Sequence, residues 1–239
     1  MPRARGTAIG VDGLLDHLLA GRDDPAIAAE LGGWLTDSPR FRAFADAHRD
    51  KIRKKLRTAG DLESLRDVRA ELRVAHLLLA DRRVELAFEA HGSGRRGPDF
   101  TVTYRKARAF DLEITRHRGD PGATSHAGPL LVKLRQLQPS VANVLLIGVD
   151  GERASALDLH GGVRRLRAMA DSKDEDFFQR RGFEGTRDFY HRFLRLAAVL
   201  AWCEGGLRDD RVSVWENGSA RIPVPGPALR AGIAALQER

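Results

Sequence analysis

Residues 97–116 read GPDFTVTYRKARAFDLEITR, two apolar segments with a short basic turn between them. Every second residue of each segment is apolar, which is the period of a β-strand that buries one face: Phe100, Val102 and Tyr104 in the first, and Phe110, Leu112 and Ile114 in the second. The turn at 105–108 is short enough for the two strands to pair as an antiparallel hairpin. The stretch therefore predicts two neighbouring strands, each with one buried face and one polar face.

The polar faces of these strands carry carboxylates. Asp99 stands just before the first strand, and Glu113 lies inside the second. In a hairpin the two polar faces lie side by side, so we expect these carboxylates to approach each other. Two carboxylates at close range repel, and a divalent cation relieves the repulsion. The pattern predicts a metal site held by Asp99 and Glu113.

Hydrophobic patterning predicts further elements on both sides of the hairpin. Apolar residues at three- and four-residue spacing predict a helix from Asp61 to Leu79, and alternation predicts a strand over Val84–Phe88. A helix from Pro129 to Leu137 then precedes the fully apolar Val144–Val149, which is typical of a strand buried on both faces. The predicted order is helix, three strands, helix and strand, which is an α/β arrangement.

This order, together with the Gly-Pro-Asp-Phe and Glu-Ile-Thr motifs of the hairpin, resembles the PD-(D/E)xK nuclease superfamily, which includes many restriction enzymes and junction resolvases. The resemblance covers roughly residues 61–150 and implies a restriction endonuclease-like αβββαβ core, a mixed sheet flanked by helices. It also implies Mg²⁺ (or Mn²⁺) held by Asp99, Glu113 and the backbone carbonyl of Ile114. The chain departs from the family pattern at one position, because Thr115 stands where the family has its lysine.

The resemblance adds two further side chains to the site. The first core helix of the superfamily often supplies a glutamate to the metal, which implies Glu71, although a glutamate beside an apolar stripe is also typical of a solvated surface. Some members carry a catalytic side chain on the second helix, which implies Lys133 as the missing cation. A surface lysine whose stem packs on apolar neighbours is the equally open alternative. Lys106 in the turn and Arg116, on the opposite strand face, are the other candidate cations. Gln136 resembles a glutamine that related nucleases place on this helix.

The chain is basic, with a formal charge of +7 and a pI of about 10.1. This balance favours a polyanionic partner, although net charge bears on association rather than on fold. Eight Lys and Arg residues lie between Arg40 and Arg57. Either a solvated face or a phosphate-contacting surface explains such a cluster. The residues predicted to contact nucleic acid are Lys51, Lys54 and Lys55 in this cluster, and Arg95 and Arg96 in the turn before the hairpin.

The 239 residues are predicted to form an N-terminal helical extension over 1–60 and a nuclease-like domain over 61–239. Within that domain the core covers 61–150, and residues 151–239 add helices and a strand.

Two further helices are predicted outside the core. One is capped at Ser38 and runs towards Leu56. The other covers the apolar run from Arg187 to Cys203, and a strand over Arg211–Trp215 follows it.

The location of the protein is predicted to be the cytoplasm. A single cysteine, Cys203, excludes an internal disulfide and fits a reducing compartment. The sequence has no run of about eighteen apolar residues that would predict a membrane span, and its basic start lacks the apolar region of a secretory signal.

The sequence thus predicts a metal-dependent nuclease that hydrolyses phosphodiester bonds of DNA. The alternative is a catalytically inactive nucleic-acid-binding module that kept the fold and lost the lysine. A third hypothesis is an interaction domain whose carboxylates only cap and solvate the hairpin. DNA against RNA, strand and sequence preference, and the oligomeric state stay open, and a homodimer is compatible with the sequence.

Overall fold

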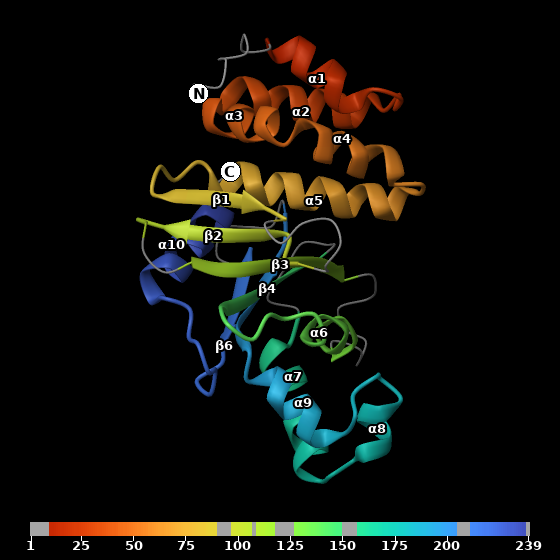
Figure 1. The fold of residues 1–239 in the computed structure, drawn as a ribbon, viewed down its shortest axis with the longest axis vertical. Helices are drawn as coiled ribbons and strands as arrows, with labels where there is room; N and C mark the ends of the chain where they lie inside the picture. Colours follow the sequence, from red (N-terminus) through yellow and green to blue (C-terminus); the bar gives the residue numbers. More distant parts are fainter. Residues whose placement is uncertain are drawn as a thin grey trace, which may run out of the picture. The chain divides into compact units, whose positions relative to one another are not determined.

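The computed structural model of the protein describes residues 10–89, 97–106, 109–117, 127–149, 157–204 and 211–237. The chain divides into two compact units, Met1–Ala80 and Asp81–Arg239, and most of their helices and strands are labelled in Figure 1. Within the described ranges, no helix is long and apolar enough to cross a membrane.

The described part of the first unit is helical. Its elements are α1 (Val11–Leu19), α2 (Pro25–Asp37), α3 (Pro39–Ala47), α4 (Arg49–Thr58) and α5 (Leu62–Leu78). Asp24, Ser38 and Asp61 precede α2, α3 and α5, and the side chain of each accepts a backbone N–H from three residues further on. Pro25 and Pro39 are first helical residues, where the missing N–H costs nothing. Short polar caps therefore fix where these helices begin.

The helix predicted from Ser38 towards Leu56 is wrong in one respect, because the structure divides it into α3 and α4. His48 lies between them with φ −115° and ψ 14°, outside the helical region. Its ring packs on Phe44, with 4.9 Å between the ring centroids. Phe44 and Ile52, on either side of His48, are both buried, and their spacing is the one expected on one face of a continuous helix. Hydrophobic periodicity therefore does not reveal the break at His48.

Polar side chains bond α5 to the other helices of the first unit. Arg69 forms a bidentate ion pair with Glu30 of α2, in which Nε donates to Oε2 at 2.6 Å and Nη2 donates to Oε1 at 2.5 Å. His76 stacks on Trp34 of α2, with 5.6 Å between the ring centroids. Burial, and then the charge of Arg73, lower the pKa of His76, so this ring stays neutral at neutral pH. The first compact unit accordingly includes α5 and ends at Ala80.

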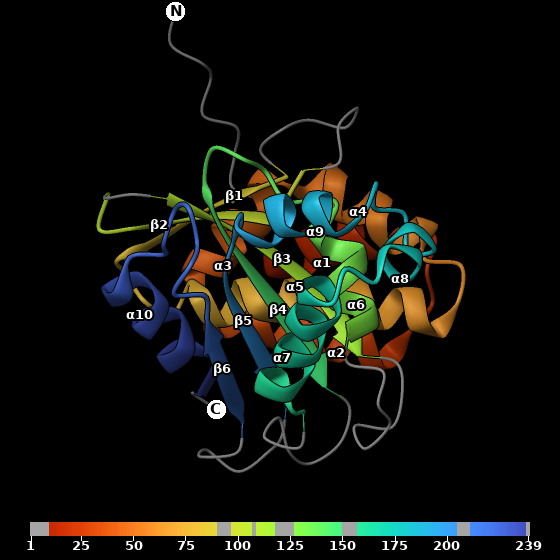
Figure 2. The same cartoon turned by 90° about the horizontal axis from the view of Figure 1, so that it is seen from below.

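The second unit is α/β, with a mixed six-stranded sheet in the order β1-β2-β3-β4-β5-β6. Its elements are β1 (Val84–Phe88), β2 (Phe100–Tyr104), β3 (Ala109–His117), α6 (Ala127–Leu134), β4 (Ala142–Val149), α7 (Leu159–Asp171), α8 (Glu175–Gln179), α9 (Thr186–Phe193), β5 (Leu196–Trp202), β6 (Val212–Glu216) and α10 (Gly226–Gln237). β1, β2 and β3 are antiparallel, β3, β4 and β5 are parallel, and β6 is antiparallel to β5. Figure 2 shows α10 on one side of β4 and β5, and α6 and α7 on the other. The predicted mixed sheet with flanking helices is confirmed.

The predicted hairpin is present as β2 and β3. Phe100 pairs with Leu112, and both are buried on one face. Thr101 pairs with Asp111 on the other face, where the threonine hydroxyl donates to the aspartate at 2.8 Å. Strand alternation therefore separates an apolar face from a carboxylate-bearing face, as the sequence predicts.

The helix predicted from Arg187 to Cys203 is wrong. α9 ends at Phe193 and the apolar run that follows is the strand β5, in which every residue is buried. β5 lies between β4 and β6, so its side chains are buried on both faces and need not alternate. A short apolar run of this kind has the same pattern in a buried helix as in a buried strand. The strand predicted over Val144–Val149 is confirmed, because it lies within the fully buried β4.

The two faces of the central strands pack on different helices. Leu145 of β4 and Val199 of β5 belong to a core that α6, α7 and α9 complete. On the opposite face, Trp202 of β5 donates its indole N–H to the carbonyl of Leu236 in α10, at 3.1 Å. Glu113 of β3 pairs with Leu145, so it shares the face that α6 covers.

Asn143, at the start of β4, joins two loops. Its amide N–H groups donate to the carbonyls of Gln138, Val141 and Arg195 at 2.8 to 3.0 Å, and its carbonyl accepts the N–H of Gln138 at 3.2 Å. Gln138 and Val141 lie between α6 and β4, whereas Arg195 lies between α9 and β5. One buried side chain thus fixes the α6–β4 loop against the α9–β5 loop.

Replacing Asn143 with leucine should lower the free energy of unfolding by about 3 kcal/mol, because several buried backbone groups lose their partner together. Urea unfolding followed by circular dichroism measures the change. Gln179→Leu, on the exposed surface of α8, is the matched control and should stay within about 0.5 kcal/mol of the wild type. Equal stability of the two variants would show that the loops do not depend on Asn143.

Candidate active site

Asp99 lies just before β2, and its carboxylate is fixed on β3. Its Oδ2 accepts the backbone N–H of Ile114 at 2.7 Å. Phe100 pairs with Leu112, so one step along the antiparallel ladder places Asp99 opposite Glu113. The N–H and C=O of one strand residue point to the same side, so the carbonyl of Ile114 is also directed towards β2. Both predicted carboxylates therefore stand on neighbouring strands, on one face of the sheet.

α6 supplies the cation that meets Glu113. Glu113 is buried, with 8% of its surface exposed. Lys133, in the last turn of α6, forms a hydrogen-bonded ion pair with Oε1 of Glu113. Removal of either partner would leave a charge that is only partly solvated, which is costly. The structure thus brings Lys133 to the glutamate, as the resemblance implies, and its catalytic role stays a prediction.

The other cations predicted near the hairpin have different surroundings. Lys106 follows β2 at the end away from Asp99. Arg116 lies on the strand face opposite Glu113, and its stem is 3.3 Å from the position that a Cβ on Gly148 would take. Arg95 and Arg96, which the sequence predicts to contact phosphates, lie outside the described residues. Lys133 is therefore the predicted cation that the structure places on the carboxylate face.

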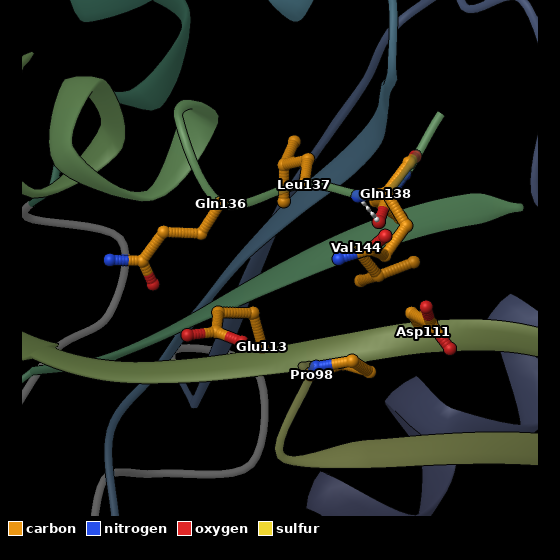
Figure 3. A pocket seen from close by; sticks show the side chains of 8 residues that line it. Pro98, Asp111, Glu113, Gln136, Leu137, Gln138 and Val144 are labelled. Atoms are coloured by element: carbon orange, nitrogen blue, oxygen red, sulfur yellow. Dashed lines mark hydrogen bonds between the residues drawn. The ribbon is translucent and has the colours of Figure 1, made fainter. Parts of the chain in front are cut away.

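A small pocket of about 10 Å³ adjoins Glu113, which is room for about one water molecule. Its lining includes Asp111, Glu113 and Gln136, and Figure 3 shows Gln136 and Glu113 extending to the same side of the view. Asp111 is 3% exposed and lies two residues before Glu113 on the same face. Asp111 is not among the site residues that the sequence predicts, although strand alternation places it on the face of Glu113.

Two of the predicted site residues of the first unit, Lys55 and Glu71, form an ion pair with each other. Lys55 of α4 donates to Oε2 of Glu71 in α5 at 2.5 Å, and both side chains are mostly buried. Lys55 therefore balances the charge of Glu71, whereas Lys51 and Lys54 are exposed on α4. Phosphate contacts by Lys51 and Lys54, and a part for Glu71 at the metal, stay predictions.

No family model, no curated protein and no solved structure matches the chain. The resemblance to the PD-(D/E)xK superfamily accordingly rests on the hairpin motifs and on the order of the elements.

The donor groups at the hairpin suit a small hard cation. Among the described residues, no group of three or more His, Cys, Asp or Glu side chains is arranged to hold a metal ion. Mg²⁺ needs fewer protein side chains than that, because it keeps several water ligands and commonly binds only one or two carboxylates. Asp99 and Glu113, with the carbonyl of Ile114, provide only oxygen donors, which are the ligands that a small hard cation prefers. The residues present therefore fit an open two-carboxylate site.

Proposed function

We propose that the protein is a metal-dependent nuclease that hydrolyses phosphodiester bonds of DNA. The contact between Lys133 and Glu113 carries this proposal. The chain has Thr115 at the position where the resemblance expects a lysine, and α6 brings an ammonium to the carboxylate of the same strand. The helix thus supplies the cation that the strand lacks.

The order of the elements supports the same proposal. α5, β1, β2, β3, α6 and β4 follow one another in the αβββαβ order of a restriction endonuclease-like core. The antiparallel β1–β2–β3 pairing and the parallel β3–β4 pairing are compatible with that core. The carboxylates then lie on the second and third strands, where the superfamily carries its metal site.

Phosphodiester hydrolysis requires that charge growing on the phosphate be balanced and that a water molecule be oriented for attack. A bound Mg²⁺ or Mn²⁺ supplies Lewis acidity and makes a bound water more acidic. Asp99 and Glu113 would hold the ion, and Glu113 also positions Lys133 through their ion pair. The Lys133 ammonium stabilises negative charge that is larger in the transition state than in the ground state.

A catalytically inactive nucleic-acid-binding module is the second candidate. The Glu113–Lys133 ion pair balances its own charge without a metal, and Thr115 replaces the family lysine. In that case the pair only stabilises the packing of α6 on β3. Activity, rather than binding, separates the two candidates.

Incubation of the wild type with single- and double-stranded DNA and RNA, in Mg²⁺ or Mn²⁺ and in EDTA, tests the proposal. The proposal predicts cleavage of DNA with metal and none in EDTA. Thr115→Lys is the companion variant, because Thr115 shares the strand face of Glu113. If the wild type is inactive on every substrate and Thr115→Lys cleaves, the native protein is a binding module and the nuclease proposal is wrong.

A further inference from the structure

A groove of about 680 Å³ lies along the α6–β4 loop and the end of α9. Three arginines line it: Arg135 just after α6, Arg192 in the last turn of α9, and Arg195 in the loop before β5. None of the described residues that line the groove is acidic. A concentration of guanidinium groups without carboxylates is typical of a surface that binds phosphates.

The hydrogen bonds among the described residues use only part of the donors of these arginines. Arg192 pairs with Asp188 of its own helix at 2.7 Å and donates to the carbonyl of Arg135 at 3.2 Å. Arg195 donates to the carbonyl of Leu137 at 3.2 Å. A guanidinium has five N–H donors, so each arginine keeps some for a ligand.

The charge of Asp188 does not cancel the charge of the groove. Burial alone would raise the pKa of Asp188, but hydrogen bonds from Arg192 and the Glu184 N–H, with the charges of Arg192 and Arg195, lower it. Asp188 is therefore ionised at neutral pH and offsets one of the three arginines. A net positive charge remains for an anionic ligand.

Two features fix the walls of the groove before any ligand arrives. Asn143 bonds the α6–β4 loop to the carbonyl of Arg195, as described above. Gly182 has a φ of +79°, and a Cβ on it would lie 2.6 Å from Nη1 of Arg135. The absence of a side chain at Gly182 leaves the room that the Arg135 guanidinium occupies.

The groove and the pocket beside Glu113 share part of their lining. Gln136, Leu137 and Gln138 line both. Val132, whose side chain is 54% exposed, adds an apolar surface on which a sugar or base can rest. We propose that the arginine groove, defined by Arg135, Arg192 and Arg195, binds backbone phosphates of the nucleic-acid strand whose scissile bond lies at Glu113. The identity of this ligand rests on the proposed nuclease function.

The test compares Arg135→Gln/Arg192→Gln with Arg164→Gln/Arg165→Gln, which removes the same charge from the exposed surface of α7. Binding of a fluorescein-labelled single-stranded oligodeoxynucleotide is measured by anisotropy over a range of NaCl concentrations, in EDTA. The groove variant should make the negative slope of log K against log salt less steep by about 1.4. The reason is that each phosphate contact on a single strand contributes about −0.7 to this slope. The control variant should keep the wild-type slope. Equal slopes for the groove variant and the wild type would overturn the proposal, as would an equal loss in the control.

Arg135→Gln alone guards against a folding defect, because Arg135 is exposed and its loss leaves the Arg192–Asp188 pair intact. The single variant should make the negative salt slope less steep by about 0.7, and its melting temperature should equal that of the wild type. Failure of the groove and failure of the nuclease proposal are distinguishable. If the wild type binds DNA through the groove but does not cleave it, only the nuclease proposal is wrong. If the wild type cleaves DNA and the groove variants keep its salt slope, only the groove proposal is wrong.

Discussion

Replacing Lys133 with methionine should lower metal-dependent DNA cleavage by about 10²–10³-fold, the usual loss when one preorganised group that balances transition-state charge is removed. Methionine keeps most of the apolar stem, so α6 retains its packing while the ammonium on Glu113 is lost. Single-turnover cleavage with saturating enzyme measures the chemical step, and anisotropy under the same conditions measures DNA binding, which should change little.

Lys106→Met is the matched control for this change. It removes one lysine charge from the β2–β3 turn, at the end of β2 away from Asp99. The control should cleave at the wild-type rate. Loss of activity in Lys106→Met, with wild-type activity in Lys133→Met, would assign the catalytic cation to the turn instead.

The second large effect is expected at Asp99. Asp99→Asn should weaken Mn²⁺ binding by about 100-fold or more. Mutation of a residue that merely hydrogen-bonds to a metal ligand already lowers metal affinity by about 10–100-fold. An asparagine oxygen can still accept the N–H of Ile114, so the hairpin keeps its geometry while the negative charge is lost. Isothermal titration with Mn²⁺ measures the affinity, and the cleavage rate should fall with it.

Asp111→Asn shows whether the right carboxylate is assigned. Asp111 shares the strand face of Glu113, and its partner Thr101 can still donate to an asparagine oxygen. Mn²⁺ affinity should stay near the wild-type value in this variant. Loss of binding in Asp111→Asn with retention in Asp99→Asn would move the metal site along β3, towards Asp111.

The strand pattern of the hairpin made much of the candidate site predictable. Alternation alone places Asp99 and Glu113 on one face, because a strand has no other way to bury Phe100 and Leu112 together. The approach of Lys133 required more than local pattern, since it depends on how α6 packs on β3. There the resemblance supplied the hypothesis, and the structure supplied the contact.

The helix predicted from Arg187 to Cys203 is wrong because burial removes the alternation of apolar and polar residues that marks a strand. β5 is apolar on both faces, so its sequence has no alternation to separate it from a helix. The arginine groove escaped sequence analysis for a related reason. Arg135 and Arg195 come from loops that are far apart in the sequence and are joined by hydrogen bonds from Asn143, Arg192 and Arg195, and no short-range pattern encodes that meeting. Lys55 belonged to a recognisable basic cluster, yet its tertiary partner is Glu71.

The central claim is that Glu113 and Lys133 act as one catalytic unit, and a double-mutant cycle on cleavage tests it most directly. Single-turnover rates in Mg²⁺ are measured for the wild type, Glu113→Gln, Lys133→Met and the double variant. Residues that act together in a mechanism show strongly non-additive losses. We predict that each single change costs about 10²–10³-fold and that the double variant is hardly slower than the singles. Losses that multiply in the double variant, or single variants that cleave like the wild type, would contradict the account.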